Sequence, residues 1–310
     1  MERKITPDDI RKSANEAFEK AKAMNEGTPD ARLDGVDSEK FGLSITLVDG
    51  TTINIGDTDT RAAIGGIARI PALLALMQQT DNPVEAAEKS DVGAGCGCKR
   101  DRYIKPRIPV GAYSVRIVSA IEPNGDPDSK WNEIINGMIS AMGSTPVLDD
   151  ALYKKLTKIN IDSNAEDVLA DTGFYLYDDA APSIDLYTRL TSICASASQL
   201  SAYGATIAAG GYSPTAKTQV FDSSIAPRIV ASMAAKGPHR ASYLWLVGTG
   251  LPARSSFSGM IVGVLPGVLS IAVYSPRVND SGISVRGAAA IEHFMNSLHL
   301  SAFSGEHIII

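Results

Sequence analysis

The chain has 310 residues, of which 44% are apolar and 21% charged, a balance typical of a folded globular protein. The formal net charge is −6, and acidic and basic residues are mixed along the chain, which excludes the clustered basic face of a nucleic-acid-binding protein. The charged start MERKITPDDIRKS is not a secretory signal, no apolar run is long enough to span a membrane, and three cysteines make no disulfide framework. We therefore expect a cytoplasmic protein that binds neither membrane nor nucleic acid.

The first part of the chain predicts a helix, a hairpin and a buried helix. At residues 6–9, TPDD combines a hydroxyl cap, a proline and two acids, which is typical of a helix start. Residues 42–57 alternate apolar and polar side chains about Asp49–Gly50, which predicts an antiparallel hairpin. The small apolar residues 64–77 predict a buried helix. Residues 80–115 mix glycine, proline and charge without a period, and we interpret them as a long loop.

The second part predicts helices followed by a second hairpin. Residues 131–142 have a helical pattern, and residues 186–209 are typical of two helices rich in small residues. The β-rich runs 260–265 and 268–274 predict a hairpin, and residues 285–298 an amphipathic helix. Strands at both ends with helices between them indicate an α+β fold, in which an antiparallel sheet is flanked by helices and carries an inserted helical region.

One long segment resembles a known family. Residues 248–287, GTGLPARSSFSGMIVGVLPGVLSIAVYSPRVNDSGISVRG, resemble the C-terminal block of the serine-dependent glutaminases, with GLPA, PG, SP and SVRG in the family order and spacing. GLSITLVDGTTINIGDTDTR, EPNGDP, NEIINGMIS and IDLYTRLTSICASASQLSAYGATIAAGGYSP are similar to further blocks of the family, in the same order. The resemblance covers residues 33–299 and implies a β-lactamase-like fold. It also implies a homo-oligomer, because family members commonly self-associate.

The resemblance implies one main domain. We expect an N-terminal helix at residues 1–27 and a glutaminase-like domain at residues 28–310. Its sheet part would comprise residues 33–70 and 215–310, and its helical part residues 71–214, with a loop insertion at 80–115.

The resemblance also implies that the usual catalytic pair is missing. The family places a serine and a lysine three residues apart at the start of the helix after the first hairpin. The matching stretch GDTDTRAAIGGIAR has Gly66 at the serine position and Arg69 at the lysine position. Glycine offers no nucleophile, and arginine stays protonated and cannot act as a base. We therefore do not expect an ordinary glutaminase.

Other positions of the family's pocket have changed or survive. The resemblance places the family's catalytic tyrosine at His239, which could act as a general acid or base, although its neighbours also fit an exposed turn. Loss of a side chain at Gly66 could leave room for an anion beside Arg69, or it could simply be a decayed position. The candidate substrate-binding residues are Gly66, Asn136, Asp162, Tyr187, Arg254, Ser255 and Phe257.

Three functions remain open at this point. The first is a repurposed enzyme that acts on a small amino-acid-like or carboxylate substrate by non-covalent acid–base chemistry, with Arg69 as an anion clamp and His239 moving a proton. The second is a non-catalytic ligand-binding or regulatory protein. The third is an amidohydrolase with a different nucleophile, Cys96 or Cys98. We expect no metal or other cofactor, because these two cysteines have no second pair of ligands in the sequence.

Overall fold

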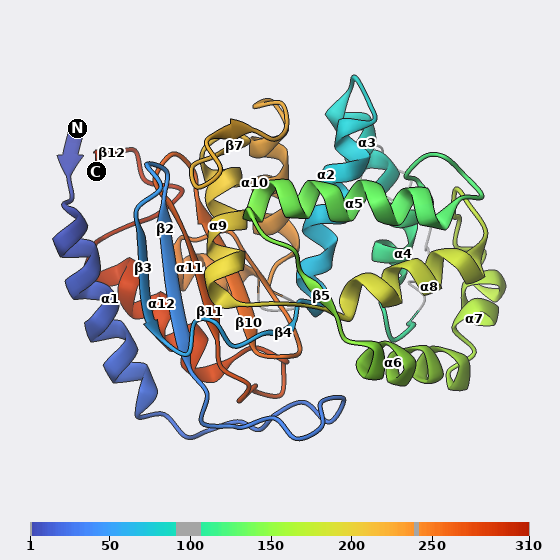
Figure 1. The fold of residues 1–310 in the computed structure, drawn as a ribbon, viewed down its shortest axis with the longest axis horizontal. Helices are drawn as coiled ribbons and strands as arrows, with labels where there is room; N and C mark the ends of the chain where they lie inside the picture. Colours follow the sequence, from blue (N-terminus) through green and yellow to red (C-terminus); the bar gives the residue numbers. More distant parts are fainter. Residues whose placement is uncertain (1, 91–106, 239–241, 310) are drawn as a thin grey trace. The chain divides into compact units, whose positions relative to one another are not determined.

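The computed structural model describes residues 2–90, 107–238 and 242–309 (Figure 1). The chain divides into two compact units. The sheet unit comprises residues 1–67, 139–147 and 194–310, and the helical unit comprises residues 68–138 and 148–193. The helical unit is therefore built from two insertions into the chain of the sheet unit.

The sheet unit is organised around a five-stranded antiparallel sheet with the strand order β3-β2-β11-β10-β9. Both predicted hairpins are confirmed: β2 pairs with β3, and β10 pairs with β11. Gly50 in the first turn has a φ of +95°, which a glycine adopts without strain. The strands are β2 (Gly42–Leu47), β3 (Thr52–Gly56), β9 (Ala253–Ser255), β10 (Met260–Leu265) and β11 (Leu269–Tyr274).

Helices cover both faces of this sheet. Helices α1 (Pro7–Lys22) and α12 (Val285–Ser297) pack against each other, and their apolar residues share one buried core with the strands. Helix α9 (Ala197–Ala208) packs on β2, β10 and β11, and its Ser201 side chain bonds the hydroxyls of Ser44 and Thr46. Because side chains alternate along a strand, α9 lies on the face opposite α1 and α12.

This packing corrects two of the expected boundaries. A separate N-terminal helix at residues 1–27 was expected, but α1 buries Ile10 and Phe18 in the core of the sheet unit. Helix α9 was assigned to a helical part at 71–214, yet it belongs to the sheet unit because its small residues and hydroxyls fit the sheet. A Cβ at Gly204 would meet the side chain of Ser270, so only glycine permits this close approach.

Smaller elements complete the sheet unit. Strand β1 pairs with β12 in parallel, β4 pairs with β6, and β7 pairs with β8. Their bounds, with two further helices, are β1 (Glu2–Lys4), β4 (Ala62–Ala63), β5 (Val147–Leu148), β6 (Ile193–Ala195), β7 (Tyr212–Ser213), β8 (Thr218–Gln219), β12 (His307–Ile309), α10 (Ala226–Lys236) and α11 (Ser242–Thr249).

The helical unit is a bundle. Helix α4 packs on α2 and α8, and α6 and α7 pack on α8. A buried ion pair of 2.7 Å joins Lys130 to Asp178 in this unit. The helices are α2 (Arg69–Gln78), α3 (Pro83–Ser90), α4 (Ala112–Ser119), α5 (Pro127–Met142), α6 (Asp150–Asp162), α7 (Ala165–Asp171) and α8 (Ala180–Thr191). The last residues of α5, from Ile139, belong to the sheet unit.

The predicted loop at residues 80–115 is wrong in part. It contains α3 and the start of α4, while residues 91–106 lie outside the described residues. Asn82 explains the helix, because its Oδ1 accepts a hydrogen bond from the backbone N–H of Val84 at 3.1 Å, and the following VEAAEK residues favour a helix. Among the described residues, no helix is both long and apolar enough to cross a membrane.

Candidate functional site

The candidate site is a short turn between β4 and α2, where the resemblance places the family's serine. Strand β4 ends at Ala63, and residues Gly65–Ala68 form one turn of 3₁₀ helix before α2 begins. The carbonyl oxygen of Ala63 accepts hydrogen bonds from Ser256 Oγ at 2.7 Å and Ser258 Oγ at 2.6 Å. Two buried hydroxyls from the segment after β9 therefore hold this turn in place.

Both glycines of the turn are in close contact with that segment. Gly65 has a φ of +46°, and a Cβ there would lie 2.9 Å from the ring of Phe257. A Cβ at Gly66 would lie 2.8 Å from the carbonyl oxygen of Ser255, a distance that real side chains do not adopt. A side chain at either position requires the backbone or the ring opposite to shift.

Anion binding beside Gly66 stays a prediction, and one group close to this position opposes it. The nearest group to the missing side chain is a carbonyl oxygen, which carries a partial negative charge and repels an anion. The α-helix also begins only at Arg69, so Gly66 does not present the N-terminus of an α-helix to a ligand.

An aromatic–cation stack lies against the turn. Phe257 is buried, and the guanidinium carbon of Arg32 lies 4.0 Å from the centre of its ring. Asp30 holds the guanidinium in place, with Arg32 Nε donating to Oδ1 at 2.7 Å and Nη2 donating to Oδ2 at 2.6 Å. The Phe257 ring therefore contacts both Gly65 and the guanidinium of Arg32, which Asp30 holds in place. We call Asp30, Arg32 and Phe257 the Phe257 stack.

Two other candidates lie on strand β9 beside the stack. Ser255 is 3% exposed, and among the described residues its Oγ has no hydrogen-bond partner. Arg254 is buried too, and its guanidinium donates to the backbone carbonyl of Lys236. The sheet unit thus brings Gly66, Arg254, Ser255 and Phe257 together, as the resemblance implies.

The remaining described candidates belong to the helical unit. Arg69 is buried in the first turn of α2, and Tyr187 is buried on α8. Asn136 is exposed on α5. Asp162 is exposed at the end of α6 and pairs with Lys158 at 2.8 Å, which is the geometry of a solvated i,i+4 ion pair.

Three sequence candidates lie outside the described residues, namely Cys96, Cys98 and His239. Within the described ranges, no group of three or more His, Cys, Asp or Glu side chains is placed to hold a metal ion. The sequence reasoning missed Asp30, Arg32, Ser256 and Ser258. Asp30 and Arg32 lie in an irregular segment without a motif. The role of the Ser256 and Ser258 hydroxyls depends on their hydrogen bonds to Ala63, which is far away in the sequence.

Comparisons with known proteins agree with this fold. The glutaminase family model matches residues 30–303. A glutaminase from Bacteroides thetaiotaomicron is 34% identical over 326 residues, covering 100% of this chain and 99% of that protein. A glutaminase from Brucella canis is 31% identical over 278 residues, covering 86% of each.

Solved structures give the same result. A probable glutaminase, YbaS, superposes with a TM-score of 0.87 at 26% identity, covering 97% of this chain and 100% of that one. A probable glutaminase from Bacillus subtilis, in complex with 6-diazo-5-oxo-L-norleucine, gives a TM-score of 0.80 at 20% identity, covering 98% of both chains. The α+β fold with an antiparallel sheet and an inserted helical region is thereby confirmed as the glutaminase, β-lactamase-like type. The chain belongs to the glutaminase family.

Proposed function

We propose that this chain is a glutaminase-family protein that does not hydrolyse L-glutamine by a serine–lysine mechanism, and that it binds a small amino-acid-like or carboxylate ligand without turnover. The turn at Gly65–Gly66 is the observation that carries the proposal. The family resemblance puts the nucleophile at Gly66, where a Cβ would lie 2.8 Å from a backbone oxygen. A glycine at this position would leave the chain without the family's serine, and the Ser255 carbonyl oxygen lies close to the point where a side chain would begin.

The proposed loss of turnover follows from the chemistry of the pair. Removing the nucleophile of a serine hydrolase lowers turnover by up to about 10⁶. Arg69 cannot replace the lysine as a base, because a guanidinium stays protonated at physiological pH. The Phe257 stack adds a bulky ring and a fixed cation beside the turn, which favours a binding role over acyl transfer.

Ser255 supplies a polar group for the proposed ligand. Its hydroxyl is buried and, in the described part of the chain, lacks a partner, and a buried hydroxyl without a hydrogen bond is costly. A ligand carboxylate that accepts a hydrogen bond from Ser255 Oγ would remove this cost. The same contact would distinguish a carboxylate from an apolar ligand of equal size.

The test combines ammonia release with calorimetric titration, both at high protein concentration. With L-glutamine we expect ammonia release at the background rate. With L-glutamate we expect saturable binding, which Ser255→Ala weakens by about fivefold, the value of one hydrogen bond. Ser281→Ala, in an exposed loop, is the matched control and should bind as the unaltered protein does.

Other results would replace the proposal with one of the earlier alternatives. Turnover that survives Cys96 and Cys98 alkylation but is lost in both Arg69→Ala and His239→Ala would establish acid–base chemistry. Turnover abolished by a thiol reagent would establish a cysteine nucleophile. Absence of both turnover and binding would remove the ligand-binding role. Self-association and a cytoplasmic location stay predictions, which light scattering and cell fractionation can check.

A further inference from the structure

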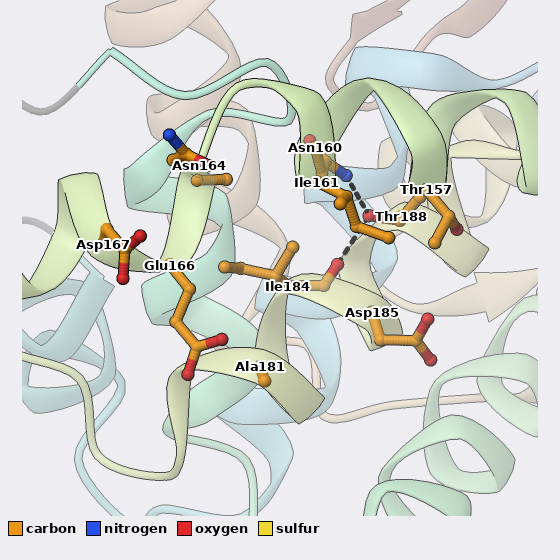
Figure 2. A pocket seen from close by; sticks show the side chains of 11 residues that line it. Thr157, Asn160, Ile161, Asn164, Glu166, Asp167, Ala181, Ile184, Asp185 and Thr188 are labelled. Carbon is orange, nitrogen blue, oxygen red and sulfur yellow. Dashed lines mark hydrogen bonds between the residues drawn. The ribbon is translucent and has the colours of Figure 1, made fainter.

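The helical unit contains a pocket that the proposed function does not use. It lies between α6, α7 and α8 and has a volume of about 270 Å³, close to the lower end for small-molecule sites (Figure 2). None of the candidate residues around Gly66 lines it. The lining residues are Thr157, Asn160, Ile161, Asn164, Ala165, Glu166, Asp167, Ala181, Ile184, Asp185 and Thr188.

The pocket has apolar walls and acidic groups. Ile184 is buried, whereas Ile161 is 68% exposed although it is a large apolar side chain. Glu166 and Asp167 come from the first turn of α7, and Asp185 comes from α8. Figure 2 shows Glu166 and Asp185 on either side of Ile184. All three carboxylates are exposed, and the lining residues include no lysine or arginine. The pocket therefore carries a net negative charge.

Asn160 adds a fixed hydrogen-bond acceptor. Its Nδ2 donates to Thr188 Oγ1 at 2.8 Å, and this hydroxyl donates in turn to the carbonyl oxygen of Ile184 at 2.6 Å. Because the hydroxyl proton of Thr188 is already used, the Asn160 atom that bonds it must be the amide nitrogen. Asn160 is 5% exposed, and its Oδ1 has no partner among the described residues. Asn160 Oδ1 is therefore a buried acceptor without a partner, on a residue that lines the pocket.

Asp185 is held as an acceptor as well. The phenol of Tyr153 donates to its Oδ1. Burial, followed by this contact, raises the pKa of Tyr153 to about 12, so the phenol keeps its proton at neutral pH. The printed bond uses only Oδ1, so Asp185 Oδ2 has no donor within the described ranges and can accept from a ligand.

We propose that this pocket binds a small organic ammonium ion with a short alkyl body. The ammonium group supplies several N–H donors and a positive charge, which match the amide oxygen and the three carboxylates. The alkyl body matches the isoleucine and alanine walls. Carboxylate ligands are disfavoured by the charge, and neutral alcohols lack the charge that the acidic residues favour.

The experiment uses the full chain and n-butylammonium as the probe, followed by amide chemical shifts in nuclear magnetic resonance spectra. We expect saturable shifts confined to α6, α7 and α8, with a dissociation constant on the order of millimolar for so small a ligand. Butyrate and 1-butanol have the same alkyl body without the cation, and both should bind at least about fivefold more weakly.

Three variants test the assignment. Glu166→Gln should weaken butylammonium binding by about threefold, the value of one exposed charge contact. Asp171→Asn makes the same charge change at the far end of α7, away from the lining, and should have no effect. Ala181→Trp adds a large ring at an exposed lining position and should abolish binding.

The proposal is overturned by equal binding of butyrate or butanol, by equal loss in Asp171→Asn and Glu166→Gln, by binding that survives Ala181→Trp, or by absence of saturable shifts. All of these results are independent of L-glutamate binding and of ammonia release. Failure here would therefore leave the proposed function standing, and the reverse also holds.

Discussion

Adding one methyl group at Gly66 tests the geometry on which the proposed function rests. Gly66→Ala places a Cβ 2.8 Å from the carbonyl oxygen of Ser255, so the turn or the β9 segment must move. Both sides are backbone, and Ser256 and Ser258 hold them together through Ala63. Overpacking of this kind costs about 1–3 kcal/mol of unfolding free energy.

A matched glycine separates this contact from the general effect of alanine. Gly137 lies inside α5, and a Cβ there has no heavy atom within 4 Å beyond its own helix. Gly137→Ala should therefore raise the free energy of unfolding by about 0.5–1 kcal/mol. Urea denaturation of both variants gives the comparison, and we expect Gly66→Ala to be less stable than Gly137→Ala by about 1–3 kcal/mol. Equal stability of the two variants would refute the close contact at Gly66 and, with it, the argument for a closed position.

Substitutions at Gly66 and Arg69, at Glu39 and at Arg286 test three further contacts. The double change Gly66→Ser with Arg69→Lys introduces a serine and a lysine where the resemblance places the family pair. Ammonia release from L-glutamine should stay at background, because the Ser255 carbonyl opposes the new side chain. Release well above background would contradict this. Hydrogen bonds from Arg277 and then Arg286 lower the pKa of Glu39 from 4.5 to about 2. Its contribution to stability is therefore complete above pH 4.5 and is lost as the pH falls towards 2. As the pH is lowered across this range, the urea midpoint should fall less steeply in Glu39→Gln than in the unaltered protein. Arg286 is 2% exposed, and its Nε donates to the carbonyl oxygen of Met24, just after α1, at 2.7 Å. Arg286→Met should therefore lower the free energy of unfolding, measured by urea denaturation, by about 2–4 kcal/mol. A decrease below about 1 kcal/mol would show that these hydrogen bonds contribute little.

Local signals in the sequence predicted the regular elements well. The cap at Thr6 was visible because both partners of the capping box lie within four residues, and the structure contains that box. The Asp49–Gly50 hairpin was visible for the same reason, since a tight turn and two alternating strands are adjacent in the chain. Helix α3 was missed because the glycine- and proline-rich residues around it concealed a short run of helix-forming residues.

The geometry of the candidate site could not be predicted in this way. The family resemblance pointed to Gly66, Ser255 and Phe257, and it left open whether Gly66 gives room for an anion or is a decayed position. The oxygen next to this position belongs to Ser255, nearly two hundred residues further along the chain. The sequence alone does not show that the two residues are close in space. Arg32 was missed because its contacts with Asp30 and Phe257 depend on the folded structure and correspond to no recognisable sequence motif.

The strand order also has a consequence for biosynthesis. Strand β2 pairs with β11, which the ribosome adds more than two hundred residues later. Throughout that interval the β2–β3 hairpin has a free edge with unpaired backbone groups, which is a typical starting point for aggregation. The nascent chain must therefore be protected until nearly all of it has been made, and fragments that stop before Leu269 should accumulate as insoluble protein.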